Sequence, residues 1–264
     1  MPELNDNQIR LILAKHALAK KEQERRENLW NPVTYGMPDL LKARTGFESN
    51  DDFIERQNKD LYSFVQSKFY LDKGLGKVSI ILIPEMKEYL SDMFYGRVRK
   101  GILWKPRGSG GTLCTSISIF LLIVYRYWKF LNLAGSEQQA KEVYKYVHPF
   151  LDCFPEYRRA AIVEEPTTSK IDFFEGKMNL EILPASETSI RGKHVPGLSI
   201  DEAVQKDAKV QKVIKAALQI PMAEPDWRIM LCSTFHEGSG EYANIWNNAD
   251  ELGFKRYKWN IFQC

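Results

Sequence analysis

The chain has 264 residues, of which 44% are hydrophobic and 27% are charged, and its formal net charge is +3. This is the composition of an ordinary globular protein, and it excludes intrinsic disorder, a collagen-like repeat and a coiled-coil rod. The weak positive charge neither requires nor excludes a nucleic-acid partner, so a basic binding surface would have to be local. The longest apolar stretch, Ile117 to Val124, is far shorter than the roughly 20 residues that cross a membrane, and no membrane partner is expected.

The start of the chain and its cysteines indicate a reducing compartment. Met1 to Asn7 is polar and lacks the basic segment and apolar core of a secretory signal. The four cysteines are far apart, form no CxxC pair and have no clustered histidines beside them: Cys114, Cys153, Cys232 and Cys264. Neither a disulfide framework nor a zinc site is expected, and a cytosolic location fits best.

Residues 1–79 are expected to form a helical and irregular N-terminal region. Residues 8–29 carry apolar side chains at helical spacing, and six basic residues lie between Arg10 and Arg26. A solvated helix face accounts for this charge, and an arm that contacts DNA or a partner is the alternative. Residues 30–76 mix Pro, Gly and polar residues with a helical stretch at 51–69.

From about residue 80, strand-like apolar runs alternate with helical segments, beginning with a helix at 84–95. This alternation of buried strands and helices predicts an α/β fold with a mainly parallel, doubly wound sheet. Glu175-Gly176 lies between two short β-like runs, which predicts a hairpin at 171–183 inserted in the α/β frame. The other expected strands are 101–104, 130–134, 198–201, 228–232 and 257–262, and the other expected helices are 112–127, 137–151, 208–218 and 241–251.

The strongest motif follows the first of these strands: Lys105-Pro106-Arg107-Gly108-Ser109-Gly110-Gly111-Thr112. A phosphate-binding loop needs glycines that let backbone N–H groups turn inward, and a helix N-terminus directly after them. It also needs a lysine for the β- and γ-phosphate oxygens and a Ser or Thr hydroxyl for Mg²⁺. The pattern G-x-x-x-x-G-K-[ST] is met at Gly110 and Thr112. It fails where Gly111 replaces the lysine and where Lys105 replaces the first glycine.

Three interpretations of this segment compete. A generic glycine turn does not account for a strand before the glycines and an apolar helix after them. A dinucleotide fingerprint fails because Leu113 stands where a third glycine is needed. The favoured interpretation is a variant phosphate loop with its lysine at the front, since the long stem of Lys105 can bring a point charge to the same phosphates. We expect Gly111 to need a backbone conformation that other residues disfavour.

Two adjacent acids, Asp201 and Glu202, end the strand expected at 198–201. An NTPase needs one carboxylate beside Mg²⁺ and a second that acts on the attacking water, so Asp201 is the candidate for the metal shell and Glu202 for the water. An ordinary exposed acidic turn is the alternative. Ser233 and Thr234 end the next strand, where ligands bind in doubly wound sheets, and their hydroxyls are candidates to sense the γ-phosphate and couple it to movement. A simple strand-ending turn explains these two residues equally well.

Together these segments resemble the ATPase domain of the large terminase subunit of tailed bacteriophages. The similarity covers roughly residues 80–260, and the order and spacing of its motifs are more specific than any single motif. The residues that carry it are Pro106-Arg107-Gly108 with Gly110 and Thr112, Ser189-Ile190-Arg191-Gly192, Leu198 to Ala203, Cys232-Ser233-Thr234, and Gly240-Glu241 through Tyr257.

The resemblance implies an additional-strand, conserved-glutamate P-loop ATPase in residues 80–264, with ATP and Mg²⁺ as cofactors. Such a protein is a motor that couples ATP hydrolysis to translocation of double-stranded DNA into a procapsid. The resemblance places a trans-acting arginine finger at Arg191, for which a surface ion pair or a DNA phosphate contact is the alternative. The implied partners are DNA, the portal protein, the small terminase subunit and further copies of the chain in a ring, in the host bacterial cytoplasm at the procapsid portal.

One departure from the family pattern concerns nuclease activity. Large terminases usually continue into an RNase H-like nuclease domain with an acidic metal-binding cluster, whereas this sequence stops at Cys264. We therefore expect a motor domain that does not cut DNA and that stays monomeric when it is isolated. A helicase-like ATPase and a non-catalytic nucleotide-binding module are the competing functions. Lys105 and the Asp201-Glu202 pair count against the second of these.

Overall fold

The computed structural model describes residues 29–72, 74, 76–186, 190, 192–201, 208–234 and 240–259. The helix expected at 8–29 lies outside these ranges except for its last residue, as do Glu202, Arg191 and Cys264. Within the described residues, no helix combines the length and the apolar character needed to cross a membrane. The three cysteines that the structure describes, Cys114, Cys153 and Cys232, are free thiols.

A seven-stranded sheet with the strand order β5-β6-β4-β7-β8-β3-β9 organises the fold. All neighbouring strands are parallel except β5 and β6, which form an antiparallel hairpin at one edge. The expected α/β fold with a mainly parallel sheet is therefore confirmed. The strands are β3 (Lys100–Trp104), β4 (Lys129–Ala134), β5 (Lys170–Phe173), β6 (Met178–Pro184), β7 (Gly197–Asp201), β8 (Arg228–Ser233) and β9 (Lys255–Lys258).

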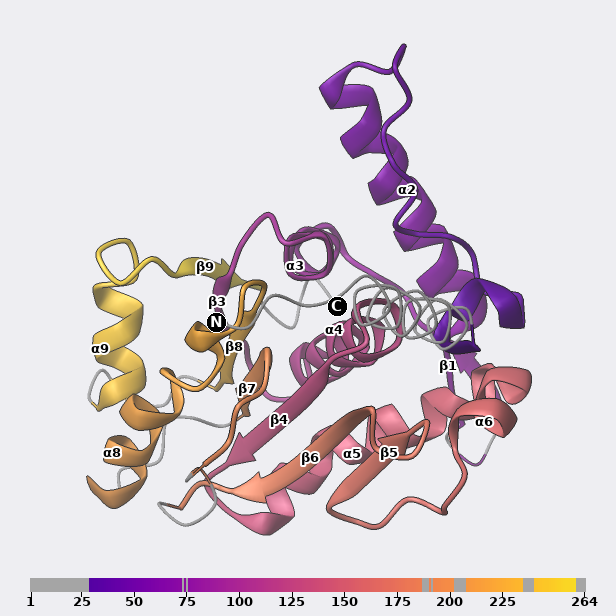
Figure 1. Ribbon diagram of the computed structural model, residues 1–264. Helices are drawn as coiled ribbons and strands as arrows, with labels where there is room; N and C mark the ends of the chain where they lie inside the picture. The colour runs from indigo at the N-terminus through magenta and orange to yellow at the C-terminus, as the bar shows by residue number, and fades with distance from the viewer. Residues whose placement is uncertain are drawn as a thin grey trace, which may run out of the picture.

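The central strands are apolar on both faces because each face is covered by helices. Successive side chains of a strand point to opposite faces, so Ile102 and Leu103 of β3 belong to two different cores. In Figure 1 the helices α8 (Ala208–Ala217) and α9 (Glu241–Asn247) lie to one side of the sheet. Their core contains Ala217 and Ile245. The larger core, on the other face, contains α3 (Pro84–Tyr95), α4 (Gly111–Arg126) and α5 (Glu137–Phe150). The sheet is thus doubly wound.

The N-terminal region packs on the larger core. The C-terminal half of α2 (Asn50–Lys68) buries Leu61, Phe64 and Val65 there, and its other half projects away from the body of the molecule (Figure 1). Ser49 caps α2, since its hydroxyl accepts a hydrogen bond from the N–H of Asp52 at 3.1 Å. The remaining elements are η1 (Pro32–Tyr35), β1 (Tyr70–Asp72) and β2 (Lys77–Ser79), which pair as a small antiparallel sheet, η2 (Leu151–Cys153), α6 (Pro155–Ala161) and η3 (Pro221–Ala223).

Most expected elements agree with the structure to within two residues, and three differ. The strand expected at 257–262 is β9, which ends at Lys258, and residues 260–262 lie outside the described ranges. The helix expected at 241–251 ends at Asn247, and turns follow it up to Gly253. The hairpin of β5 and β6 forms at the expected place, with Gly176 at a φ of 77° in its turn. However, it is not an insertion: residues 179–184 of β6 pair in parallel with the whole of β4, so the hairpin completes the edge of the central sheet.

Candidate functional site

The glycine-rich segment forms a tight loop between the end of β3 and the start of α4. Gly108 and Gly110 have φ values of 76° and 75°, in the left-handed region that favours glycine. The Ser109 hydroxyl donates a hydrogen bond to the carbonyl of Pro106 at 2.8 Å and closes the turn. No side chain caps α4, so the N–H groups of its first turn can serve as donors for an anion.

Three predicted site residues meet at this loop: Lys105 and Thr112 belong to the loop itself, and Asp201 comes from the end of β7. The Lys105 Nζ donates a hydrogen bond to the Thr112 Oγ1 at 2.9 Å, and that hydroxyl donates to the Asp201 Oδ2 at 3.1 Å. The Lys105 Nζ also lies 4.0 Å from the Asp201 Oδ1. Lys105 is 6% exposed and Asp201 3%, so a buried cation and a buried carboxylate share one hydroxyl. The structure therefore brings together the lysine, the hydroxyl and the first carboxylate that the sequence predicts.

The structure also shows why residue 111 is a glycine. Gly111 is the first residue of α4, and its φ is not in the left-handed region, so the expected backbone reason is wrong. Instead, a Cβ at this position would lie 2.3 Å from the Cδ of Lys105 and 2.9 Å from its Cγ. The stem of Lys105 thus fills the space in which a side chain at 111 would begin. A side chain at position 111 would therefore require the Lys105 stem to move from this position.

Ser233 and Thr234 lie between the phosphate loop and Asp201, because β8 stands between β3 and β7. Ser233 pairs with Trp104 in the sheet, and its carbonyl accepts a hydrogen bond from the N–H of Lys105 at 3.2 Å. Both residues are buried, Ser233 at 0% and Thr234 at 3% exposure. Both residues lie at the C-terminal end of β8, as expected, and their coupling role stays a prediction.

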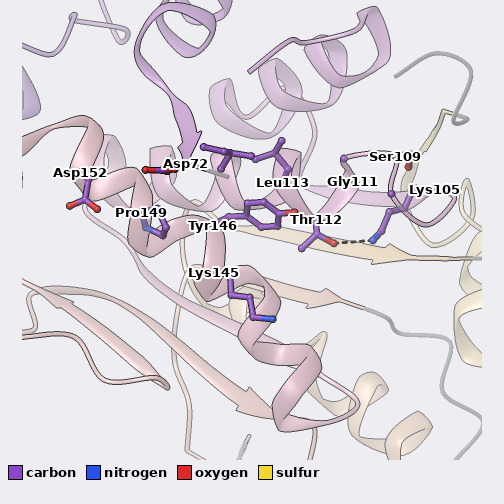
Figure 2. Close-up of a pocket in the computed structure, with 13 residues that line it drawn as sticks. Asp72, Lys105, Ser109, Gly111, Thr112, Leu113, Lys145, Tyr146, Pro149 and Asp152 are labelled. Carbon is purple, nitrogen blue, oxygen red and sulfur yellow. Dashed lines mark hydrogen bonds between the residues drawn. The ribbon is translucent and has the colours of Figure 1, made fainter. Parts of the chain in front are cut away.

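A cavity of about 580 Å³ opens over the loop. Lys105 and residues 108–113 line one part of it, and side chains of α5, η2 and β1 line the remainder (Figure 2). The nucleotide-binding residues expected at Pro106 and Arg107 are not among its walls, and Arg107 is exposed. Glu202 directly follows Asp201 in sequence, but it and Arg191 lie outside the described residues.

The underside of the loop rests on buried aromatic residues to which the sequence analysis gave no role. The Trp259 Nε1 donates a hydrogen bond to the carbonyl of Ser109 at 2.8 Å, and Trp259 is 1% exposed. Tyr89 packs edge-on against Trp259, and its hydroxyl lies 3.4 Å from the Thr115 Oγ1 in α4. Burial raises the pKa of the Tyr89 hydroxyl and of the Cys114 thiol, so both stay protonated at neutral pH. No local pattern could have identified Trp259, because its partner is distant in sequence.

Taken together, the loop and the strand order define a class of fold. A phosphate-type loop joins one parallel strand to its helix, an acidic residue ends another, and one further strand, β8, separates the two. This strand order is that of a P-loop-type α/β fold with an additional strand, as the resemblance found in the sequence implies.

Comparisons with solved structures agree with this class. The large terminase of bacteriophage HK97 superposes with a TM-score of 0.59 and 16% sequence identity over 76% of this chain. The large terminase of the thermophilic bacteriophage D6E superposes with a TM-score of 0.57 and 12% identity over 70% of this chain. The chain spans 43% and 47% of the lengths of those two proteins. No protein-family model and no curated protein matches its sequence. The chain therefore shares the fold of one part of these two phage large terminases.

Proposed function

We propose that this chain is the ATP-hydrolysing motor domain of a phage large terminase, which couples hydrolysis of Mg-ATP to translocation of double-stranded DNA into a procapsid. The observation that carries the proposal is the contact of Lys105, Thr112 and Asp201 at a glycine loop, in a fold shared with large terminases. Residues 80–264 would form the motor, and residues 1–79 would be its N-terminal appendage.

The loop would hold the triphosphate through its backbone N–H groups and the N-terminus of α4. In this role the Lys105 ammonium neutralises phosphate charge as the lysine of an ordinary loop does from position 111. The Lys105 side chain passes directly over Gly111, the first residue of α4, and this position next to the helix N-terminus supports the role.

The donor set of the site fits Mg²⁺. A hydroxyl and a carboxylate oxygen lie 3.1 Å apart at Thr112 and Asp201, and Mg²⁺ prefers oxygen ligands, usually one or two from the protein with the remainder from phosphates and water. These two residues would hold the ion, which when bound neutralises charge on the phosphate oxygens.

The reaction needs two further groups on this chain. Glu202, next to Asp201, would accept a proton from the attacking water or polarise it. Arg191 would stabilise the charge that spreads over the γ-phosphoryl oxygens in a neighbouring subunit. Ser233 and Thr234 would sense the γ-phosphate from β8. A ring of copies at the portal protein, with the small terminase subunit, would then act in the bacterial cytoplasm.

The proposal is tested by steady-state ATP hydrolysis with and without Mg²⁺ and double-stranded DNA. We expect hydrolysis that requires Mg²⁺ and rises when duplex DNA is added, and that is absent from a Glu202→Gln control. The assignment is overturned if the parent protein shows no Mg²⁺-dependent hydrolysis of ATP at any protein concentration. Unwinding of a labelled duplex in the same reactions would favour a helicase over a packaging motor, and binding to isolated portal protein would favour the packaging motor.

A further inference from the structure

The cavity over the phosphate loop extends beyond the loop residues. Besides the loop residues, Leu113, residues of α5 and η2, and the end of β1 line it. The roles proposed above use only the end formed by Lys105 and the loop. The other end is lined by residues of α5, η2 and β1, and these side chains are aromatic, apolar and acidic as well as basic.

An apolar wall adjoins the loop. Leu113 of α4 and Tyr146 and Pro149 of α5 line this part of the cavity, and Figure 2 shows the Tyr146 ring projecting from α5 toward Thr112. Tyr146 is partly exposed, and no described residue makes a hydrogen bond with its hydroxyl. A flat aromatic ring next to a phosphate site, held by a helix of the central core, is a surface on which a planar group can stack.

Two carboxylates line the far end of the cavity. They belong to Asp72 of β1 and to Asp152, just after α5. The Asp72 Oδ1 accepts a hydrogen bond from the N–H of Gly74 at 2.8 Å, and Asp152 pairs with Arg158. The rim cation Lys145 is paired with Glu142 at 2.5 Å. Carboxylates accept hydrogen bonds and repel anions, so this end suits an uncharged group rich in donors rather than a second phosphate.

We propose that Tyr146, with Leu113 and Pro149, forms the stacking surface for the base of a nucleoside triphosphate whose phosphates lie in the loop. The cavity has the Lys105 side chain at the loop and two carboxylates at its far end, which matches a ligand with an anionic tail and a neutral head that carries amino and hydroxyl donors. This inference rests on the proposed nucleotide-binding function and names the part of the chain that recognises the nucleoside.

The test separates the nucleoside from its phosphates. ADP and inorganic pyrophosphate share the phosphate group and differ in the nucleoside, and dissociation constants for both are measured with Mg²⁺ by calorimetry. Because stacking of a base on an aromatic side chain strengthens binding about tenfold or more, we expect Tyr146→Ala to weaken ADP binding by about that factor. Tyr146→Ala should leave pyrophosphate binding unchanged, and Tyr146→Phe, which keeps the ring, should bind ADP like the parent.

Tyr144→Ala is the matched control. Tyr144 lies on the same helix but stacks on His148 with ring centroids 5.2 Å apart, and it does not line the cavity. Unchanged ADP binding by Tyr146→Ala, while the parent protein binds ADP, overturns the inference and leaves the proposed function standing. Failure of the parent to bind either ligand instead overturns the proposed function.

A second measurement does not depend on affinity. Photoactivated 8-azido-ADP should label the protein near the bound base. After digestion, mass spectrometry should find the label on the peptide that contains Tyr146. Protection by unlabelled ADP is expected. A label placed only on peptides away from α5, α4 and β1 would overturn the inference.

Discussion

At the scale of single residues, the variant loop depends on how Lys105 packs against Gly111. The Lys105 stem crosses the first residue of α4, where a Cβ would lie 2.3 Å from its Cδ. The ammonium group therefore reaches Thr112 and Asp201 from the front of the loop only if residue 111 has no side chain. Positions 105 and 111 are thus coupled, because a side chain at 111 would displace the Lys105 stem.

The first prediction exchanges the two residues. Lys105→Ala should abolish hydrolysis and lower the free energy of unfolding by about 3 kcal/mol, because it leaves the buried Asp201 without its cation. Gly111→Lys alone should also be inactive, since two stems compete for one space. The double variant Lys105→Ala/Gly111→Lys should regain hydrolysis at least about tenfold above either single variant, since the lysine returns to its usual place in the loop. Steady-state ATPase rates and urea unfolding check this, and a double variant no better than Lys105→Ala would contradict it.

The second prediction separates the two acids. Glu202→Gln should bind Mg-ATP like the parent and lose most turnover, since an amide keeps the shape of the side chain but cannot accept a proton. Asp201→Asn should instead weaken nucleotide binding in the presence of Mg²⁺ and change it little in the presence of EDTA. Binding isotherms and single-turnover rates distinguish the two variants. Normal turnover by Glu202→Gln would refute the assignment of the catalytic carboxylate.

At the scale of secondary-structure elements, the loop is held from two sides. Its first residue is tied to β8 through the Lys105 N–H and the Ser233 carbonyl, and its tip is tied to the segment after β9 through Trp259. Because β3 lies between β8 and β9 in the sheet, both neighbours of the loop strand fix the loop. Its shape is therefore set before a ligand binds, which reduces the cost of binding.

The third prediction tests this support. Trp259→Phe keeps most of the buried ring but removes the donor to Ser109, so we expect a loss of about 1 kcal/mol in the free energy of unfolding. The KM for ATP should rise, because the loop is less well held, and kcat should change less. Trp227→Phe is the control, since Trp227 is buried just before β8, at the opposite end of that strand from Ser233. Equal effects of the two variants on KM would show that Trp259 has no specific role at the loop.

At the scale of the whole molecule, the predicted site residues that the structure describes gather at one edge of the central sheet. The C-terminal edge of the sheet carries the loop, Asp201 and Ser233, and the cavity above the loop is lined by residues of this chain on the sides described above. Completion of the site by an arginine from a second copy is the proposal that remains for Arg191. Gly192 beside it has a φ of 69° with no atom near its Cβ position, which fits an exposed turn.

The fourth prediction uses mixed assemblies. An Arg191→Ala subunit has an intact Glu202, and a Glu202→Gln subunit has an intact arginine, so mixing the two inactive variants should restore hydrolysis. An arginine finger supplied by a neighbouring subunit raises kcat by about 10³- to 10⁵-fold. Hydrolysis should therefore be measurable even if only a small share of the active sites receives an intact arginine. The double variant Arg191→Ala/Glu202→Gln, mixed with Arg191→Ala, supplies no finger and should restore nothing. No recovery in the first mixture, once cross-linking shows that mixed assemblies form, would contradict a trans role. The specific activity of the parent should also rise with protein concentration.

The sequence by itself determined the features that depend on near neighbours. Alternating apolar runs and helical periods located the strands and most of the helix boundaries, and glycines before an apolar helix located the loop, because backbone preference and burial act over a few residues. Tertiary structure decided the features that join distant segments. Packing alone placed β8 between β3 and β7, attached the β5–β6 hairpin to β4, and laid Lys105 across Gly111. It also turned Tyr146 toward the loop and brought Trp259 beneath it, because no local pattern specifies which faces of two remote elements meet.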